Sequence, residues 1–297
     1  MKKISRRKFI GTSALGLLAA AYLPSCKSAA TKSTPFGWPL SFQSYGVREL
    51  LGEDFSGTMK KLHDIGYGGI EMCSPQGYEK AGFAPLIKYS ASELKKIIED
   101  SGLFCKSSHF QNPEVKAEGL PATIEFAHGL GLTDVVCSAA WLPEDASLDD
   151  WKKFADEMNQ AGEEIQKAGL KLGYHNHSIG PEVEGRQLYD ILMELFDPKM
   201  VEMQFQVASV SEGFDVVEYI AKYPGRYFAL HMHDWDPDTK KIVPIGKGIV
   251  DWKKLLTTAK DGGLANYGMI VEIETDKTGD PFQGLVDSIN YLDTLNL

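Results

Sequence analysis

Five histidines are the first residues of this chain that indicate chemistry, because each lies in or at the end of a short apolar run. They are His109, His175, His177, His231 and His233, and the acidic residues Glu71 and Glu272 stand in similar runs. Imidazole nitrogens and carboxylate oxygens are common ligands of divalent metal ions, and imidazole also exchanges protons near neutral pH. These residue types predict a metal site, an acid–base site, or both.

The stretch "LGYHNHSIG" (172–180) contains two of these histidines around one asparagine. On an extended strand, His175 and His177 would have the same orientation and Asn176 the opposite one, so the three need a strand end to act together. If the strand ends at this point, His177 turns into the following loop. The alternative is one buried histidine beside a surface one. His63 and His128 lie in helix patterns and are interpreted as structural.

Eight short apolar runs alternate with amphipathic stretches from residue 38 onward. The runs cover 40–47, 68–74, 103–110, 134–140, 170–177, 201–210, 227–234 and 267–274. Helix patterns separate them, for example 90–102, with Ser90 or Ser92 as cap and Gly102 as stop, and 147–169. Alternating strands and helices predict parallel pairing, and eight such units predict a closed (β/α)8 barrel. An open doubly wound sheet is the alternative, but no G-x-G-x-x-G follows the first strand.

A barrel of this kind carries its site at the carboxyl ends of the strands. The five histidines fall at those ends, together with Gln43, Glu71, Gln206 and Glu272. This clustering at one face favours a metal site.

The N-terminus is interpreted separately from the barrel. "SRRKF" (5–9) precedes an apolar run of about 14 residues, shorter than the roughly 20 that a membrane span needs, which is typical of a twin-arginine export signal. "LPSC" (23–26) resembles a lipobox, with Cys26 as the lipidated residue. We therefore expect a signal peptide over 1–25, a flexible tether over 26–37 and one barrel domain over 38–297. The protein is expected to be exported, periplasmic or anchored to a membrane only through its lipid. An uncleaved anchor or a basic arm is the alternative.

Composition restricts the partners. The 297 residues are 43% hydrophobic and 24% charged, and the formal net charge is −10, so no attraction to nucleic-acid phosphates is expected. Cys73, Cys105 and Cys137 are an odd number in apolar runs, which predicts buried thiols rather than a disulfide framework.

The chain resembles the sugar phosphate isomerase/epimerase group, with its xylose-isomerase-like TIM barrel, over essentially all of its length from residue 38. The resemblance is carried by "IGYGGIEM" (65–72), "YHNH" (174–177), "YPGRYFALHMHDWD" (223–236), "IGKGIVDW" (245–252) and "IVEIE" (270–274). It implies a single divalent ion held by Glu, Asp, His and Glu from the fifth to the eighth strand. Endonuclease IV shares the barrel, but its DNA substrate disagrees with the acidity and the export signal of this chain.

Two of the four implied ligand positions depart from that pattern. The resemblance assigns the metal to His175, Gln206, His231 and Glu272, so that His replaces Glu and Gln replaces Asp. The second position could instead align with Gln204. Fewer carboxylates and two imidazoles shift the preference from Mg²⁺ or Mn²⁺ toward Zn²⁺, Co²⁺, Ni²⁺ or Fe²⁺. Loss of the metal, with these residues lining a polar pocket, is the alternative.

Family epimerases use two carboxylates, at the positions of His175 and Glu272, on opposite sides of an enediolate. With one carboxylate replaced, loss of a leaving group after enolisation, as in a 3-keto-glycoside lyase, becomes a rival to epimerisation. His177 or His233 could replace the lost base, and Lys247 could meet a carbonyl or an anionic group.

The implied substrate is a non-phosphorylated carbohydrate or keto-sugar. Its predicted contacts are Gln43, Glu71, His109, Asn176 and Trp235, while Trp141 and Trp252 could add a stacking wall. A non-catalytic, surface-tethered sugar-binding barrel is the alternative function, and a homo-oligomer stays open.

Overall fold

Eight parallel strands close into one barrel in the computed structural model, which describes residue 32, residues 34–273 and residues 280–297. Around the barrel the order is β1-β12-β9-β8-β5-β4-β3-β2. The strands are β1 Ser41–Gln43, β2 Gly69–Cys73, β3 Phe104–Phe110, β4 Asp134–Cys137, β5 Lys171–His175, β8 Val201–Gln206, β9 Tyr227–Met232 and β12 Met269–Val271. The prediction of a closed (β/α)8 barrel is confirmed, and the open sheet is excluded.

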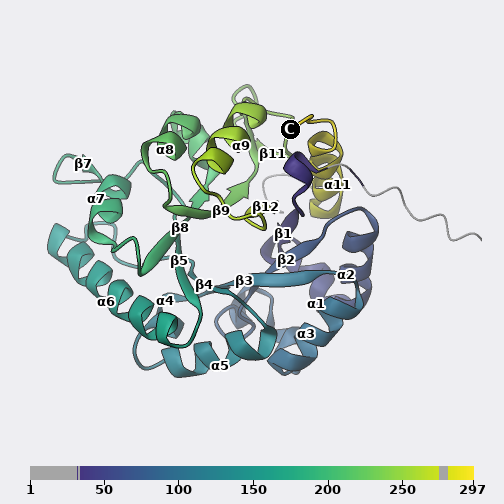
Figure 1. Cartoon of the computed structure of the whole chain (residues 1–297), viewed down its shortest axis with the longest axis horizontal. Coiled ribbons are helices and arrows are strands. Elements are labelled where there is room, and N and C mark those ends of the chain that lie inside the picture. Colours follow the sequence, from purple (N-terminus) through teal and green to yellow (C-terminus); the bar gives the residue numbers. More distant parts are fainter. Residues whose placement is uncertain (1–31, 33, 274–279) are drawn as a thin grey trace, which may run out of the picture. The chain divides into compact units, whose positions relative to one another are not determined.

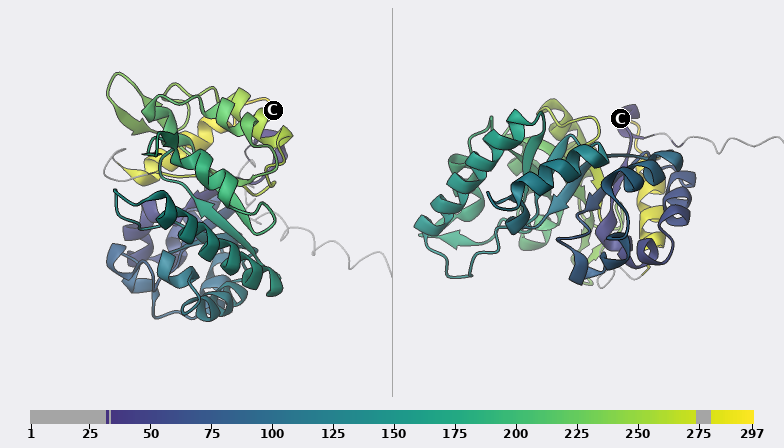
Figure 2. Two further views of the ribbon diagram at one scale, coloured as in Figure 1. Left: turned by 90° about the vertical axis from the view of Figure 1, so that its left-hand side faces the viewer. Right: turned by 90° about the horizontal axis from the view of Figure 1, so that it is seen from below.

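Helices form an outer ring around the strands (Figure 1), and two further views show the strands inside that layer (Figure 2). The α-helices are α1 Arg48–Glu53, α2 Phe55–Asp64, α3 Ala91–Asp100, α4 Asn112–Val115, α5 Leu120–Leu130, α6 Leu148–Lys167, α7 Leu188–Leu195, α8 Val216–Lys222, α9 Trp252–Asp261 and α11 Pro281–Leu292. Short 3-10 helices are η1 Pro35–Gly37, η2 Ser44–Val47, η3 Glu79–Ala81, η4 Ala84–Leu86 and η5 Val207–Glu212. Of the helices that the structure describes, none combines the length and the apolar character needed to cross a membrane.

Local sequence signals account for the helix ends. Ser90 caps α3 in a capping box with Glu93, so Ser90 rather than Ser92 is the cap. Ser147 and Asp150 form the same box at α6. Reciprocal hydrogen bonds of this kind satisfy backbone N–H groups that have no partner within the helix.

Two small antiparallel hairpins were not anticipated from the sequence. They pair β6 Glu182–Val183 with β7 Arg186–Gln187, and β10 Asp234–Asp236 with β11 Lys241–Val243. Both lie in loops at the carboxyl ends of barrel strands. The second hairpin belongs to a loop that is organised by the buried carboxylate of Asp234, which accepts hydrogen bonds from the backbone of Gly246 and Val250 and from the indole of Trp252.

Apolar side chains fill the barrel toward the amino ends of its strands. Val136, Phe228, Ala229 and Ile270 form a cluster separate from the main core, with Tyr267 packed against it. Gly173 leaves the space that Phe228 occupies, because a Cβ atom there would lie 2.5 Å from the phenyl ring. Cys73, Cys105 and Cys137 are free and buried, as predicted.

The predicted export signal (1–25) and Cys26 lie outside the described residues, as does the tether except for residues 32 and 34–37. Export and lipidation stay predictions.

Candidate functional site

The carboxyl ends of the strands bring a layer of polar side chains together inside the barrel mouth. Alternate residues of a strand face the same side, so Ser107 and His109 of β3 point inward together, as do Gln204 and Gln206 of β8. The other members of the layer are Gln43 of β1, Glu71 of β2, His175 of β5, His231 of β9, and Glu272 directly after β12. All nine side chains are buried.

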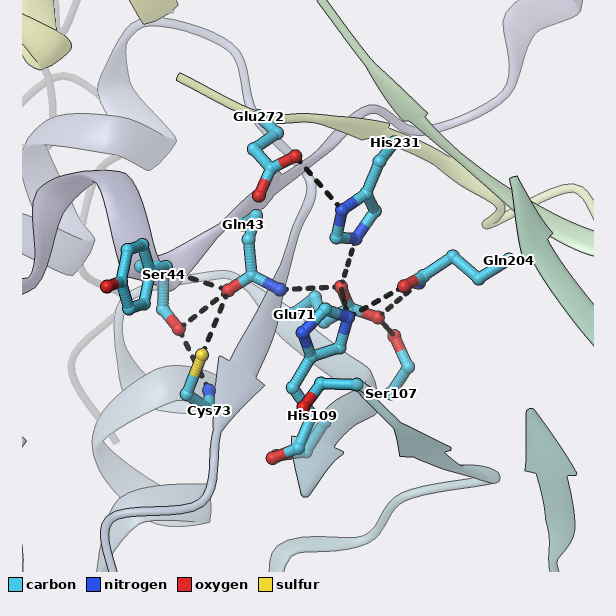
Figure 3. Close-up of polar contacts among 12 residues, drawn as sticks. Gln43, Ser44, Glu71, Cys73, Ser107, His109, Gln204, His231 and Glu272 are labelled. Carbon is cyan, nitrogen blue, oxygen red and sulfur yellow. Dashed lines mark hydrogen bonds and ion pairs between the residues drawn. The ribbon is translucent and has the colours of Figure 1, made fainter. Parts of the chain in front are cut away.

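Glu71 is the centre of one hydrogen-bond network (Figure 3). Its Oε2 accepts from Gln43 Nε2 at 2.6 Å and from His231 Nε2 at 2.6 Å. Its Oε1 accepts from Ser107 Oγ at 2.6 Å and from Gln204 Nε2 at 2.7 Å. Burial alone would raise the pKa of Glu71, but the adjacent His109 and His231 and the hydrogen bonds lower it to about 2. This carboxylate is therefore held ionised.

Glu272 lies on the other side of His231. Its Oε2 accepts from Gln206 Nε2 at 2.9 Å and lies 3.2 Å from His231 Nδ1, with His233 Nε2 at 3.8 Å. Burial would raise the pKa of Glu272, but these neighbours, His231 first, lower it. Glu272 is 8% exposed, whereas Glu71 is completely buried.

His231 bridges the two carboxylates, one at each ring nitrogen. Burial would lower its pKa, but Glu272 and Glu71 raise the pKa of His231 to about 10. In the absence of an ion, this ring is therefore doubly protonated. A histidine that binds a metal must release one of these protons, while the other N–H stays on its carboxylate partner.

Three imidazoles form the group best placed to hold a metal ion. His109, His175 and His231 each offer one ring nitrogen, and these atoms lie within 4.8 Å of one another. Burial lowers the pKa of His175 and of His109, which favours the neutral form of both rings. His175 Nδ1 is buried and has no hydrogen-bond partner among the residues with described placement. A neutral, unpartnered ring nitrogen is what a metal ligand requires.

Two glutamines fix the orientations of two histidines. Gln204 donates a hydrogen bond from Nε2 to Glu71, so its oxygen accepts from His109 Nε2 at 2.7 Å. Gln206 donates a hydrogen bond from Nε2 to Glu272, and its oxygen accepts from His233 Nε2 at 2.6 Å. In this orientation the Gln206 oxygen that a metal would need is already hydrogen-bonded.

The four residues assigned to the metal from sequence all lie in this layer. His175 and His231 have ring centroids 4.4 Å apart, and Glu272 contacts both His231 and Gln206. His109 was expected to contact substrate, yet its ring nitrogen joins the two imidazoles. Gln43 and Glu71 were also expected to contact substrate; they are hydrogen-bonded to each other, and Glu71 also to His231, while their contact with substrate stays a prediction.

The remaining predicted residues lie around this layer. His177 is exposed, with its ring 4.8 Å from that of His175. Asn176 is buried and accepts from the Gln206 backbone N–H at 3.2 Å. Lys247 is exposed on the loop before α9, and Trp235 is half-buried on β10. Trp252 is 1% exposed, so the idea that it stacks on a sugar is wrong.

Ser107 and Gln204 are the contributors that sequence reasoning missed or left as an alternative. Each stands two residues before a predicted residue, His109 and Gln206 respectively, on the same strand face. The period of two along a strand was the available signal.

The profile of the xylose isomerase-like TIM barrel family matches residues 59–295. An inosose dehydratase from Geobacillus kaustophilus is 30% identical over 202 residues, which are 63% of this chain and 64% of the dehydratase. The match therefore spans less than two thirds of that relative's length.

A solved sugar phosphate isomerase/epimerase from Parabacteroides distasonis is 27% identical, with a TM-score of 0.73, over 91% of this chain and 98% of the other. Two structures below 20% identity share the fold. They are the IolI protein with a bound zinc atom (15%, TM-score 0.62, 86% and 96% covered) and 3-keto-D-glucoside 4-epimerase from E. coli (16%, TM-score 0.63, 87% and 100% covered).

Proposed function

Because the chain belongs to the xylose isomerase-like TIM barrel family, we propose that it is a divalent-metal-dependent enzyme that removes a proton next to the carbonyl of a keto-sugar. The proton loss is followed by elimination of a group from the neighbouring carbon. The observation that carries this proposal is the neutral, unpartnered imidazole of His175 next to two other histidines and near Glu272.

The residues present fit a divalent ion. His109, His175 and His231 would hold it, and Glu272 lies within reach of the same space because it contacts His231. Three imidazoles and one carboxylate favour Zn²⁺, Co²⁺, Ni²⁺ or Fe²⁺ over Mg²⁺, with Mn²⁺ between them. Glu71 would orient His231 in this ligand set, because it accepts the Nε2–H of His231 and leaves Nδ1 directed toward Glu272.

When bound, the ion would supply a Lewis acid that polarises the substrate carbonyl. Glu272 is the base of the proposed reaction. Gln206 and His231 hold its Oε2, and Oε1, which has no hydrogen bond to any described residue, takes the proton from the carbon next to the carbonyl. The electron pair forms the new double bond while the bond to the leaving oxygen breaks. His177, exposed beside His175, gives the leaving oxygen a proton.

Elimination is favoured over epimerisation because only one carboxylate is available as a base. Epimerisation returns a proton to the opposite side of the same carbon and needs a second group there. The fifth-strand position of that group holds His175, and in our proposal its buried, unpartnered Nδ1 binds the ion and is not available to carry a proton. The relative from Geobacillus kaustophilus, named as a dehydratase, supports the same type of reaction.

We propose a non-phosphorylated substrate. The export signal predicted for residues 1–25 supports a substrate outside the cytoplasm.

Metal analysis of three proteins tests the proposal. We expect the wild-type chain to bind one divalent ion and His175→Ala to lose it. His128→Ala, which removes an exposed histidine of α5, is the matched control and should keep the ion. A wild-type chain with no ion, and with no activity after addition of any, would support the non-catalytic sugar-binding barrel instead.

The reaction is tested by incubation with a 3-keto-glucoside and with an inosose in D₂O. Release of the leaving group, or of water, without sugar inversion is expected. Deuterium in an inverted, otherwise intact sugar would identify an epimerase and contradict the elimination.

A further inference from the structure

Trp141 is the most exposed large apolar side chain in the described part of the chain. It is 68% exposed, compared with 54% for Ile249 and 37% for Ile87. It stands four residues beyond the end of β4, in the loop that leads to α6, and therefore at the carboxyl end of that strand, as does the site. An apolar ring in such a loop needs a reason, because burial elsewhere would remove it from water.

The backbone at Trp141 is strained. Its φ is +53°, a left-handed conformation that bulky side chains rarely adopt. Strain of this kind persists only where the surroundings enforce it, and it is concentrated at functional sites.

Hydrogen bonds to the end of β3 enforce this conformation. Ser138 donates its backbone N–H to Phe110 at 3.0 Å, and Asn112 donates its side-chain N–H to the carbonyl of Ala140. The indole itself donates Nε1–H to Gln111 Oε1 at 2.6 Å. Gln111 is two residues beyond His109, so the ring is pinned beside the strand end that carries a candidate metal ligand. Trp141 is therefore a rigid aromatic surface at the edge of the site.

The surroundings of Trp141 suit a single small ring. The residues that follow, Pro143, Glu144 and Asp145, are exposed, and two of them are acidic. A stable protein interface needs roughly 800 Å² of contiguous surface on each partner, far more than one indole. Acidic neighbours also oppose an anionic membrane surface. A six-membered ring with an apolar face and polar edges matches an indole surrounded by polar groups.

We propose that Trp141 is a stacking platform for a second ring of the substrate, the ring that departs with the leaving oxygen. This rests on the proposed function and narrows its substrate class to keto-glycosides with a cyclic leaving group. The reacting ring lies against the histidines and Glu272, and the departing ring lies on the indole. A free keto-cyclitol has no group to place there.

The test compares one-ring and two-ring ligands on the full chain by calorimetry. Methyl glucoside is the one-ring probe, and maltose and 4-nitrophenyl glucoside are two-ring probes with a sugar and an aromatic second ring. Trp141→Gly is the main variant, because glycine adopts a positive φ without strain and the fold does not suffer. Ile249→Ala, which trims an exposed side chain of another loop, is the control.

Trp141→Gly should weaken the two-ring probes about tenfold and leave the one-ring probe unchanged, because stacking of one ring gives an effect of that size. With keto-glycosides, KM should rise by a similar factor while kcat stays the same. Equal binding by wild type and variant, or equal losses for both kinds of probe, would overturn the platform. So would a variant that changes only self-association or binding to anionic vesicles.

Failure of the proposed function gives a different result. If no keto-sugar is turned over but maltose binding still depends on Trp141, the platform stands and the chemistry is wrong. If turnover is normal and Trp141→Gly has no effect on two-ring ligands, only the platform is wrong.

Discussion

Glu71 and Glu272 are glutamates at the same end of one barrel, and both contact His231, yet their surroundings differ. Glu71 is completely buried and accepts four hydrogen bonds through both of its oxygens. Glu272 is 8% exposed and is hydrogen-bonded only through Oε2 within the described residues. The first carboxylate has no acceptor capacity left for a substrate, whereas the second has one oxygen available.

The difference teaches that the number of donors and the access of substrate, rather than residue type, separate a positioning carboxylate from a base. Four donors and an adjacent cation hold Glu71 ionised although it is buried, and they fix the histidine in front of it. In our proposal Glu272 has fewer partners because its second oxygen takes a proton from the substrate.

Replacement of the base is expected to have the largest effect. Glu272→Gln keeps the size of the side chain but removes its ability to accept a proton. We expect turnover to fall about 10³-fold, within the range found for loss of a general base. Stability should change by less than about 1 kcal/mol, because Glu272 Oε1 has no hydrogen bond to any described residue and the amide oxygen of glutamine can still accept from Gln206 and His231.

Turnover of a keto-glycoside and urea unfolding of the same preparations measure both quantities. Activity within tenfold of wild type would exclude Glu272 as the base, and His233 would then be the next candidate because it lies 3.8 Å from the same carboxylate.

Glu71→Gln should have the opposite result, with a large loss of stability. The side-chain NH2 group of the glutamine would face groups that themselves donate hydrogen bonds, and His231 would lose its negatively charged partner. We expect a loss of about 3 kcal/mol in the free energy of unfolding, and metal affinity lower by about 10- to 100-fold. Glu163→Gln, on the exposed face of α6, is the control. A Glu71 variant as stable as this control would show that the four hydrogen bonds do not stabilise the barrel.

The barrel could be predicted from sequence because its signals are local. Eight apolar runs, capping residues such as Ser90 and Ser147, and helix stops such as Gly102 each act within a few residues. The hairpins were missed because their strands have two or three residues, too few for a periodic pattern.

The candidate site was predictable in its residue types but not in its pairings. His109 lies on β3 and His231 on β9, which are not neighbours in the barrel, so their approach depends on closure of the whole sheet. The contact between Glu71 and His231 spans 160 residues for the same reason. The alternation of residues along a strand predicts which side chains point inward, but it does not predict which of them meet across the barrel interior.

Substitution of the two glutamines that hydrogen-bond Glu71 and Glu272 should have smaller effects and tests the same difference between these carboxylates. Gln204 serves Glu71, and Gln206 serves Glu272, two residues apart on one strand. We expect Gln204→Leu to cost about 1–2 kcal/mol of stability, since it leaves buried polar groups without partners, with little change in kcat. Gln206→Leu should lower turnover about tenfold, because the base loses its orientation.

Thermal or urea unfolding and steady-state kinetics on both variants make the measurement. If the two substitutions lowered stability and turnover in the same proportion, the two carboxylates would belong to one functional unit, and the division drawn between them would fail.

Asp134 is another buried carboxylate and lies at the amino end of β4, away from the site. Thr133 Oγ1 donates to its Oδ2 at 2.5 Å and Tyr267 OH at 2.9 Å, while Oδ1 has no partner among the residues described. Burial therefore outweighs the hydrogen bonds and raises the pKa of Asp134 to about 6. Glu71 accepts twice as many hydrogen bonds, and there these bonds and the adjacent histidines outweigh burial, so its pKa is lowered.

This contrast predicts a pH dependence of stability. Unfolded Asp134 loses its proton near pH 3.8 and folded Asp134 near pH 6, so the native state holds more protons between these values. Stability from this group is complete below pH 3.8 and falls as pH rises through the window, by about 1–3 kcal/mol. Asp134→Asn should remove that slope and be the more stable protein at neutral pH. Urea unfolding of both proteins at about pH 4, 5 and 7 measures the difference. Parallel curves would mean that donor count does not separate Asp134 from Glu71.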